Sequence, residues 1–185
     1  MADFTSAGMQ NVLNFCYTGR HEELTDENIE ETLMTCRDIL RGLQILQSHC
    51  AAYLSRYNIE NALPYYRICQ KFKISPLSIE IWSFICNNFE SISRTLSYLR
   101  SDKDNVIQLL SEDCLIVPEM SVFQAAIAWL ENQGKECESV ALQVLDTVRF
   151  SLINPLDIVK EVEPKLAQLT LSKTEMYGIL YRAMA

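Results

Sequence analysis

The chain has 185 residues, of which 49% are hydrophobic and 22% are charged, so it is long and apolar enough to bury one compact core or two small ones. Its 24 acidic and 16 basic residues give a net charge of −8, which repels phosphate backbones and anionic lipid. Nucleic acid and membrane surfaces are therefore not expected as partners.

No stretch approaches the roughly 18 consecutive apolar residues of a membrane span, and the first ten residues have neither the basic start nor the apolar run of a secretory signal. The seven cysteines are odd in number and lie mostly in apolar segments, where a free thiol behaves as a small hydrophobe. These features favour a reducing compartment, either the cytoplasm or the nucleus.

Hydrophobic residues recur at helical spacing almost throughout, and glycine and proline occur only five times each. This pattern predicts an all-α fold made of antiparallel helix pairs joined by short turns. A first helix is predicted from Thr25, an N-cap followed by Asp26 and Glu27, to about Leu40. The next covers 43–57, where a broad apolar stripe requires a packing partner.

Three later helix starts combine a capping side chain with a proline in the first turn, where proline is tolerated. The pairs are Asn61 with Pro64, Ser75 with Pro76, and Asn154 with Pro155. A further helix over 119–132 carries a wide apolar face and is predicted to end at Gly134.

Groups suited to acid–base catalysis are few, because the chain has only two histidines, His21 and His49. His49 precedes Cys50, but successive helical side chains point about 100° apart, so Cys50 is predicted to be a core residue rather than a nucleophile beside its base. No paired metal-ligand spacing and no glycine-rich phosphate loop is present, so neither a metal nor a cofactor is expected. The sequence predicts that the chain is not an enzyme.

Three features have two interpretations each. Cys137, near Lys135, is either an exposed reactive thiol or an inert loop cysteine. The acidic run 21–31 either docks a basic partner or forms a solvated helix start. Four tyrosines across one helix–helix junction form either an interaction surface or half-buried packing. They are Tyr53, Tyr57, Tyr65 and Tyr66.

Several motifs together resemble the BTB–BACK family of the kelch-like branch. "VLNFCYTG" and "LTDENIEETL" resemble the carboxy-terminal part of a BTB (POZ) domain. The stretch 61–92 resembles the start of a BACK domain, with Ala62 in place of the usual cysteine. The segments 106–132 and 145–155 carry the family's Leu-Leu, Asp, Val, Val-Phe, Trp and Val-Arg-Phe pattern, and 177–185 resembles the end of the linker before kelch repeats.

This resemblance implies a domain organisation of three parts. Residues 1–57 form the carboxy-terminal part of a BTB domain. Residues 58–163 form a BACK domain, whose first helices are those nearest the cullin and are called the 3-box. Residues 164–185 form a carboxy-terminal helix or linker.

The resemblance also implies a function. BTB–BACK proteins are non-catalytic adaptors: the BTB half dimerises and binds cullin-3, the first BACK helices extend that contact, and a distal domain holds a substrate protein for ubiquitination. The chain is therefore expected to resemble substrate adaptors of cullin-3 RING ubiquitin ligases. The alternative is a helical interaction module that binds cytoskeletal or transcriptional partners and has no ligase role. The sequence does not specify the substrate protein.

Compared with the family pattern, the chain lacks the first half of the BTB domain, with its cullin motif, and any kelch repeats. It is expected to be a fragment, an isoform or a divergent short member. Apolar residues that would pack on the missing sheet, such as Val12 and Tyr17, favour a rearranged start or self-association. Any cullin-3 contact is expected to be weakened by the loss of avidity. Its predicted residues are Asp38, Leu43, Tyr53, Tyr57, Tyr65, Tyr66 and Phe72.

Overall fold

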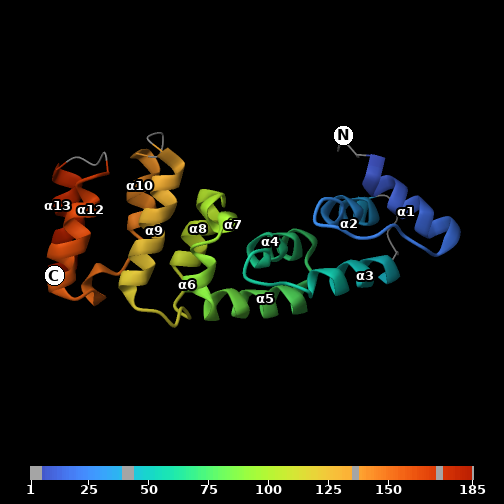
Figure 1. The fold of residues 1–185 in the computed structure, drawn as a ribbon, viewed down its shortest axis with the longest axis horizontal. Helices are drawn as coiled ribbons and strands as arrows, with labels where there is room; N and C mark the ends of the chain where they lie inside the picture. The colour runs from blue at the N-terminus through green and yellow to red at the C-terminus, as the bar shows by residue number, and fades with distance from the viewer. Residues whose placement is uncertain (1–5, 39–43, 135–137, 170–172, 185) are drawn as a thin grey trace. The chain divides into compact units, whose positions relative to one another are not determined.

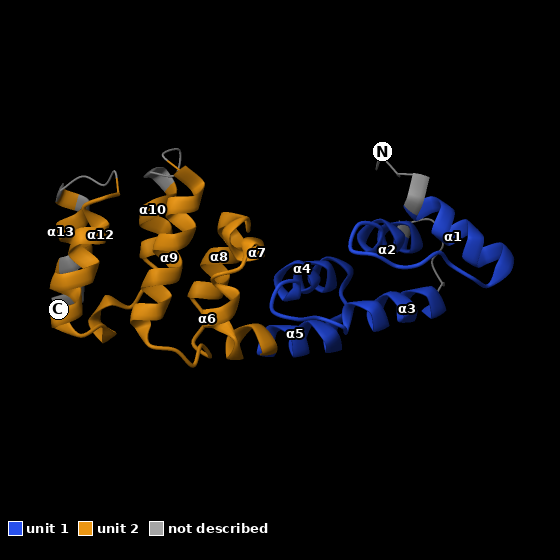
Figure 2. Cartoon of the chain, in the orientation of Figure 1, with its two compact units in different colours: residues 1–83 blue, residues 84–185 orange. Residues whose placement is uncertain are grey.

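The computed structural model describes residues 6–38, 44–134, 138–169 and 173–184 of the chain (Figure 1). In these ranges every regular element is a helix, which confirms the predicted all-α class. The chain divides into two compact units, Met1–Ser83 and Phe84–Ala185, which Figure 2 colours separately. The boundary lies inside helix α5, Ser75–Asn87, so one helix contributes residues to both units.

The first unit places its amino-terminal helix against the next one. Gly8 lies on the contact between these two helices, because a Cβ added there would come within 2.8 Å of the Glu31 backbone. Val12 packs with Cys36 and Leu46 in a small buried cluster, with Phe15 at its edge. The helices before α5 are α1 Ser6–Thr18, α2 Ile29–Asp38, α3 Gln44–Leu54 and α4 Ala62–Phe72.

Some of the apolar residues near the start of the chain are exposed to solvent, and others are buried within the first unit. Val12 is fully buried, whereas Leu13 is 44% exposed and Tyr17 is 85% exposed. The cover for Val12 comes from α2 and α3 rather than from a sheet. One face of α1 is therefore packed within the first unit, and another carries exposed apolar side chains.

The second unit continues from α5 through short helices into longer ones that lie side by side (Figure 1). Its helices are α6 Phe89–Ile92, α7 Leu96–Leu99, α8 Lys103–Leu110, α9 Glu119–Gln133 and α10 Glu138–Leu145, followed by a 3₁₀ turn Phe150–Leu152, α11 Pro155–Asp157, a π-helical turn Ile158–Val162, α12 Glu163–Leu166 and α13 Lys173–Met184.

Helix α9 is the central element of the second core, and its predicted apolar face is confirmed as buried. The Trp129 indole N–H donates to the Ser101 carbonyl at 2.9 Å, and the Tyr98 hydroxyl donates to the Ala125 carbonyl at 3.1 Å. Phe123 meets Phe150 edge-on at 5.9 Å between ring centroids. These contacts combine apolar burial with satisfied polar groups, which is what a well-ordered core requires.

Two of the predicted helix boundaries are confirmed by local geometry. The Asn154 side chain accepts the Leu156 N–H at 2.9 Å, with Pro155 as the first helical residue. Helix α9 ends before Gly134, which has a φ of 72°. A positive φ is accessible to glycine at little cost, and this explains the stop.

The predicted start of the helix after Thr25 is wrong by three residues. Helix α2 begins at Ile29, and 26–28 form a turn. The Asn28 side chain accepts the Thr25 N–H at 2.9 Å and donates to the Glu23 carbonyl at 2.9 Å. Because Asn28 ties down the preceding backbone in this way, the chain stays in a turn until Ile29.

The ends of α4 are held differently from the expected cap. Asn61 occupies the N-cap position, but its side chain accepts the Asn58 N–H at 2.6 Å instead of a helical N–H. At the other end, Lys73 has a φ of 58° and donates to the Gln70 carbonyl, while Ile74 donates to the Cys69 carbonyl. This hydrogen-bond pattern is a Schellman motif with lysine at the position where glycine is usual.

Cys50 is fully buried in α3, as predicted for a core residue. Burial raises the pKa of Cys50 to about 12, and the nearby Cys36 contributes to the rise. Burial also raises the pKa of Cys36 and of Cys69 to about 11, from an ordinary value of 9.0. These thiols stay protonated in the folded chain at pH values where the unfolded chain ionises them.

We expect the free energy of unfolding to fall as the pH rises above about 9, by up to about 1.4 kcal/mol per pH unit for each such thiol. The folded pKa values are raised, so the stabilisation is complete below the unfolded pKa and is lost as the pH approaches 11 to 12. Urea unfolding between about pH 8 and pH 10.5 with a reductant present measures this slope. Cys69→Ala should make the slope shallower, and a flat profile in the parent chain would contradict the assignment.

Candidate partner-binding surface

The structure brings two of the four predicted tyrosines together over one carboxylate. The rings of Tyr53 on α3 and Tyr65 on α4 have centroids 6.0 Å apart. Both hydroxyls donate to the same Asp26 oxygen, Tyr53 at 2.8 Å. Burial, followed by the hydrogen bond to Asp26, raises the pKa of Tyr65 well above its ordinary value. Asp26 thus connects the turn before α2 to both α3 and α4.

Tyr66 faces a different neighbour. Its ring stacks on Trp82 of α5 with centroids 4.5 Å apart, and its hydroxyl accepts the Gln70 side-chain N–H at 2.8 Å. Tyr65 is 4% exposed and Tyr66 is 7% exposed, whereas Tyr53 and Tyr57 are half-buried. The rings of Tyr65 and Tyr66 are used mainly inside the first unit, and they present little area to a partner.

Phe72, the last residue of α4, is half-buried beneath two cations. The Arg37 guanidinium carbon lies 5.3 Å from the centre of the Phe72 ring, and the Lys71 nitrogen lies 5.8 Å from it. Lys71 also pairs with Glu30 at 2.6 Å. Cations at this distance from an aromatic face are attracted by its quadrupole, so α2 and the end of α4 are joined at an accessible edge.

A groove of about 470 Å³ lies beside Phe72, and we refer to it as the α2–α3–α4 groove. Two cations, Arg37 and Lys73, are among the described residues that line it, and none of these described residues is acidic. In a chain with a net charge of −8, this is a locally basic site. The lining residues are Leu33, Arg37, Gln44, Gln47, Ser48, Ala51, Phe72, Lys73 and Ile74.

Of the remaining predicted site residues, Asp38 is the last residue of α2, directly after Arg37 of the groove lining. The Asp38 side chain, Leu43 and Cys137 lie outside the described residues. Of the predicted contact residues, the groove lining therefore includes Phe72.

The two histidines of the chain pair with each other rather than with a cysteine. His21 Nδ1 lies 2.6 Å from the Glu22 carbonyl oxygen, so this nitrogen carries the proton and donates. His21 Nε2 and His49 Nδ1 are hydrogen-bonded to each other at 3.0 Å. Within the described ranges, no group of three His, Cys, Asp or Glu side chains is placed to hold a metal ion.

Residues 62–163 match the model of the BACK family, whose description is "BTB And C-terminal Kelch". This match covers more than half of the chain. The chain belongs to the BACK family.

Kelch-like proteins are among the relatives of this BACK protein. Kelch-like protein 28 of Mus musculus is 26% identical over 149 residues, which cover 80% of the chain and 26% of the relative. Kelch-like protein 22 of Homo sapiens is 28% identical over 179 residues, covering 94% of the chain and 28% of the relative. Kelch-like protein 31 of Danio rerio is 24% identical over 193 residues, covering the whole chain and 28% of the relative. The chain spans about a quarter of the length of the curated relatives it matches.

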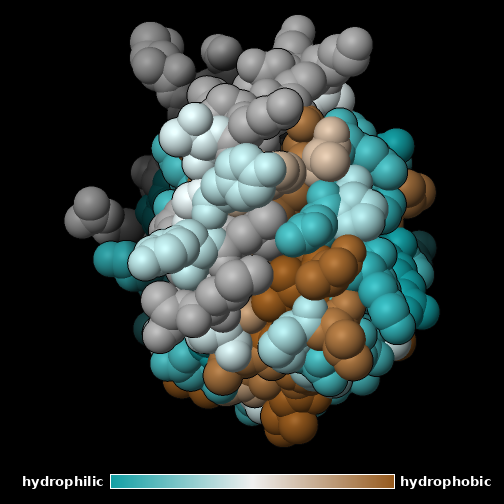
Figure 3. Space-filling model, turned by 90° about the vertical axis from the view of Figure 1, so that its left-hand side faces the viewer, coloured by the Kyte–Doolittle hydropathy of each residue, from teal (hydrophilic) through white to brown (hydrophobic). Residues whose placement is uncertain are grey.

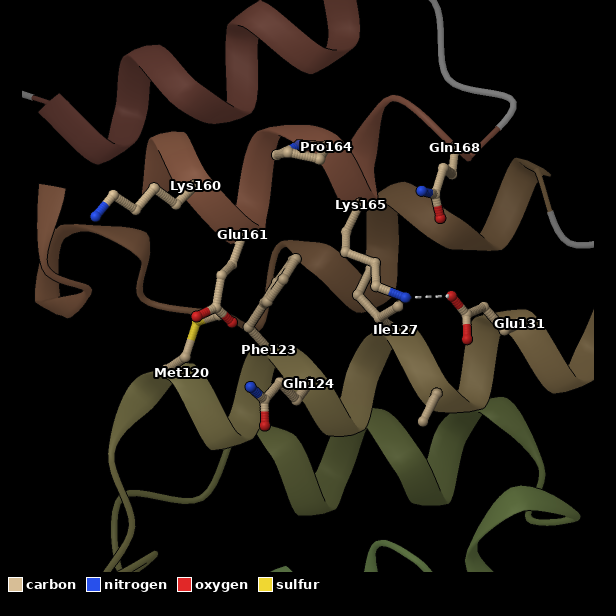
Figure 4. Close-up of a pocket in the computed structure, with 11 residues that line it drawn as sticks. Met120, Phe123, Gln124, Ile127, Glu131, Lys160, Glu161, Pro164, Lys165 and Gln168 are labelled. Atoms are coloured by element: carbon tan, nitrogen blue, oxygen red, sulfur yellow. Dashed lines mark hydrogen bonds and ion pairs between the residues drawn. The ribbon is translucent and has the colours of Figure 1, made fainter. Parts of the chain in front are cut away.

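A second hollow, of about 480 Å³, lies between α9 and residues 160–168. Figure 4 shows Phe123 and Ile127 of α9 facing Pro164, with the Lys165–Glu131 ion pair at one end. That pair measures 3.1 Å, and both side chains are about half exposed. Acidic and basic residues are equally represented in the lining, so its charge does not favour one class of partner.

Exposed apolar residues gather on the last helices of the BACK protein. Figure 3 views the face that carries α12 and α13, where hydrophobic side chains interrupt the hydrophilic surface. The exposed ones in this part of the chain include Leu152, Leu156, Val159, Tyr177 and Tyr181. In the part of the chain that the structure describes, no helix is both long and apolar enough to cross a membrane.

Arg37, Lys73, Gln44 and Gln47 were not among the site residues predicted from the sequence. They come from three helix ends and meet only in the folded unit. A basic residue in the last turn of α2 and an aromatic residue ending α4 are each ordinary features of helices. No spacing in the sequence relates Arg37 to Phe72 and Lys73, which are 35 and 36 positions away, so no local signal marks the groove.

Proposed function

We propose that the chain acts as a non-catalytic adaptor of the cullin-3 RING ubiquitin ligase class, and that the α2–α3–α4 groove receives part of the cullin surface. Membership of the BACK family supports the class. The observation that carries the assignment is a basic groove with the accessible Phe72 at its edge, on helices where the family resemblance implies the cullin contact. Affinity is expected to be low, and the working compartment is the cytoplasm or nucleus.

The mechanism is positional. The adaptor forms no covalent bond with the substrate protein. It holds the substrate protein close to the ligase, so that ubiquitin transfer becomes effectively intramolecular. Within the first unit, the Asp26 hydrogen bonds join α3 to α4, and the stacking of Tyr66 on Trp82 joins α4 to α5, so these helices keep fixed positions relative to one another. The groove is thereby pre-organised, which reduces the entropy that binding must overcome.

We expect Phe72→Ala to weaken binding to the amino-terminal domain of cullin-3 by about tenfold or more, because Phe72 lines the groove and a large apolar ring that a partner buries contributes strongly to affinity. Titration calorimetry measures the affinity, after light scattering has given the mass and shown whether the chain self-associates. Tyr65 and Tyr66 are less suitable probes, since both are buried and alanine there would disturb folding first.

Ile79→Ala is the matched control, because Ile79 is 70% exposed on α5 and is not part of the groove lining. It should bind as the parent chain does. Saturable binding that Phe72→Ala leaves unchanged would remove the groove assignment but keep the adaptor function.

The alternative is a helical interaction module without a ligase role. The burial of Tyr65 and Tyr66 favours it, because these rings then stabilise a scaffold rather than meet a partner. Lack of cullin-3 binding by a folded, monodisperse sample would support this alternative and exclude the adaptor proposal.

A further inference from the structure

Two cysteines of the second unit lie in direct contact. Cys86 is on α5 and is 3% exposed, and Cys114 is an exposed residue in the segment 111–118 between α8 and α9. Their sulfur atoms are 3.0 Å apart, although 28 positions separate them in the sequence. Neither thiol has a role in the groove or in the proposed adaptor function.

The distance is short enough for a covalent bond with little rearrangement. A disulfide joins its sulfurs at about 2.05 Å, so these two atoms need to approach by about 1 Å. Cys86 is fixed by its helix, whereas Cys114 lies in irregular backbone that adjusts more easily. Neighbouring contacts tie this segment and the start of α9 to Arg149: Asp113 pairs with the Arg149 guanidinium at 2.5 Å, and the Arg149 backbone N–H donates to Glu119 at 2.8 Å.

We propose that Cys86 and Cys114 form a reversible intramolecular disulfide when the chain meets a hydroperoxide. The exposed Cys114 thiolate attacks the peroxide oxygen, the O–O bond breaks, and the leaving alkoxide or hydroxide takes a proton, which gives a sulfenic acid at Cys114. The Cys86 sulfur then attacks the Cys114 sulfur, and water leaves. In total, two thiols and one hydroperoxide give one disulfide, one alcohol and one water. A dithiol reductant restores both thiols by exchange.

The surroundings of Cys86 set the speed of the second step. Burial, together with Cys114 and the Glu112 carboxylate, raises the pKa of Cys86 to about 12. Glu112 lies 3.8 Å from the Cys114 sulfur, so its charge is close to the reacting atoms. The thiolate is the attacking species, so closure is slow at neutral pH and accelerates as the pH rises. Glu112→Gln, which removes the negative charge, should accelerate it further.

The test uses the full chain without any partner. The reduced protein is treated with hydrogen peroxide, free thiols are blocked by alkylation, and a non-reducing digest is analysed by mass spectrometry. The expected result is a peptide pair linked through Cys86 and Cys114, with the loss of two free thiols per chain and their recovery after dithiothreitol. The disulfide closes a loop of the unfolded chain, so oxidation should also raise the melting temperature.

Two variants make the result specific. Cys114→Ser changes an exposed residue and should fold, yet it should give neither the linked peptide nor the rise in melting temperature. Cys16→Ser removes another exposed thiol and should leave both unchanged. Overoxidation of Cys114 without the linked peptide, or linkage of Cys114 to a different cysteine, would overturn the proposal. Neither outcome affects the cullin-3 assignment, which is measured separately.

Discussion

Replacing Trp129 by alanine is expected to lower the free energy of unfolding by about 3 to 5 kcal/mol, the largest effect of any substitution considered for this chain. Trp129 lies on α9 with its side chain almost completely buried, and its indole N–H donates to the Ser101 carbonyl at 2.9 Å. Truncation leaves a cavity in the second core and removes the hydrogen bond to that carbonyl. Domain stabilities are typically 5 to 15 kcal/mol, so the variant should be partly unfolded near physiological temperature.

Trp129→Phe separates the two contributions, because it keeps most of the apolar volume and loses the N–H donor. It should cost about 1 to 2 kcal/mol. Urea denaturation followed by circular dichroism gives both values. The chain has two tryptophans, Trp82 and Trp129, so fluorescence of the phenylalanine variant follows Trp82 alone. A loss below about 1 kcal/mol for the alanine variant would show that α9 is not packed as described.

Gly8→Ala is expected to destabilise the chain by about 1 to 2 kcal/mol, in spite of the better helix propensity of alanine. The new Cβ would lie 2.8 Å from the Glu31 carbonyl carbon and 2.9 Å from its oxygen. These are backbone atoms of α2 and do not rotate away as a flexible side chain would. The helices α1 and α2 must move apart, which weakens the cluster around Val12.

Gly178→Ala is the matched control, because it adds the same methyl group to a helix at a position where, outside the backbone of its own helix, no described residue comes within 4 Å of the new Cβ. It should stabilise the chain by about 0.5 to 1 kcal/mol. Thermal unfolding of both variants, with limited proteolysis of α1, provides the comparison. If Gly8→Ala were as stabilising as Gly178→Ala, the close approach of α1 to α2 would not exist in solution.

Features that depend on neighbours within one helical turn were predictable from the sequence. The Asn154 cap, the stop before Gly134 and the buried face of α9 all follow from interactions between residues at most four positions apart. The start of α2 shows the limit of this reasoning. Thr25 is a good cap in isolation, but the Asn28 side chain bonds the Thr25 N–H and the Glu23 carbonyl, 26–28 form a turn, and the helix begins only at Ile29.

The candidate site was predictable only in outline. The tyrosine cluster was visible as a local concentration of aromatic residues, but the sequence did not show that Asp26 accepts from two of them or that Trp82 covers a third. Those contacts join helices and turns that loops separate in the sequence, so the spacing of residues within one helix does not predict them. The same is true of the pair Cys86–Cys114, in which each cysteine alone looks like an ordinary apolar residue.

Helix α5 has a consequence for how this chain can be divided experimentally. The boundary between the compact units falls after Ser83, and the fully buried Ile81 and Ile85 stand one helical turn apart on either side of it. A fragment cut at that boundary would begin in mid-helix with several unpaired backbone N–H groups. The BACK family match instead starts at residue 62 and keeps α4 and α5 whole. At its amino-terminal end the family match therefore begins with a complete helix, α4, and an expression fragment should start before Ala62.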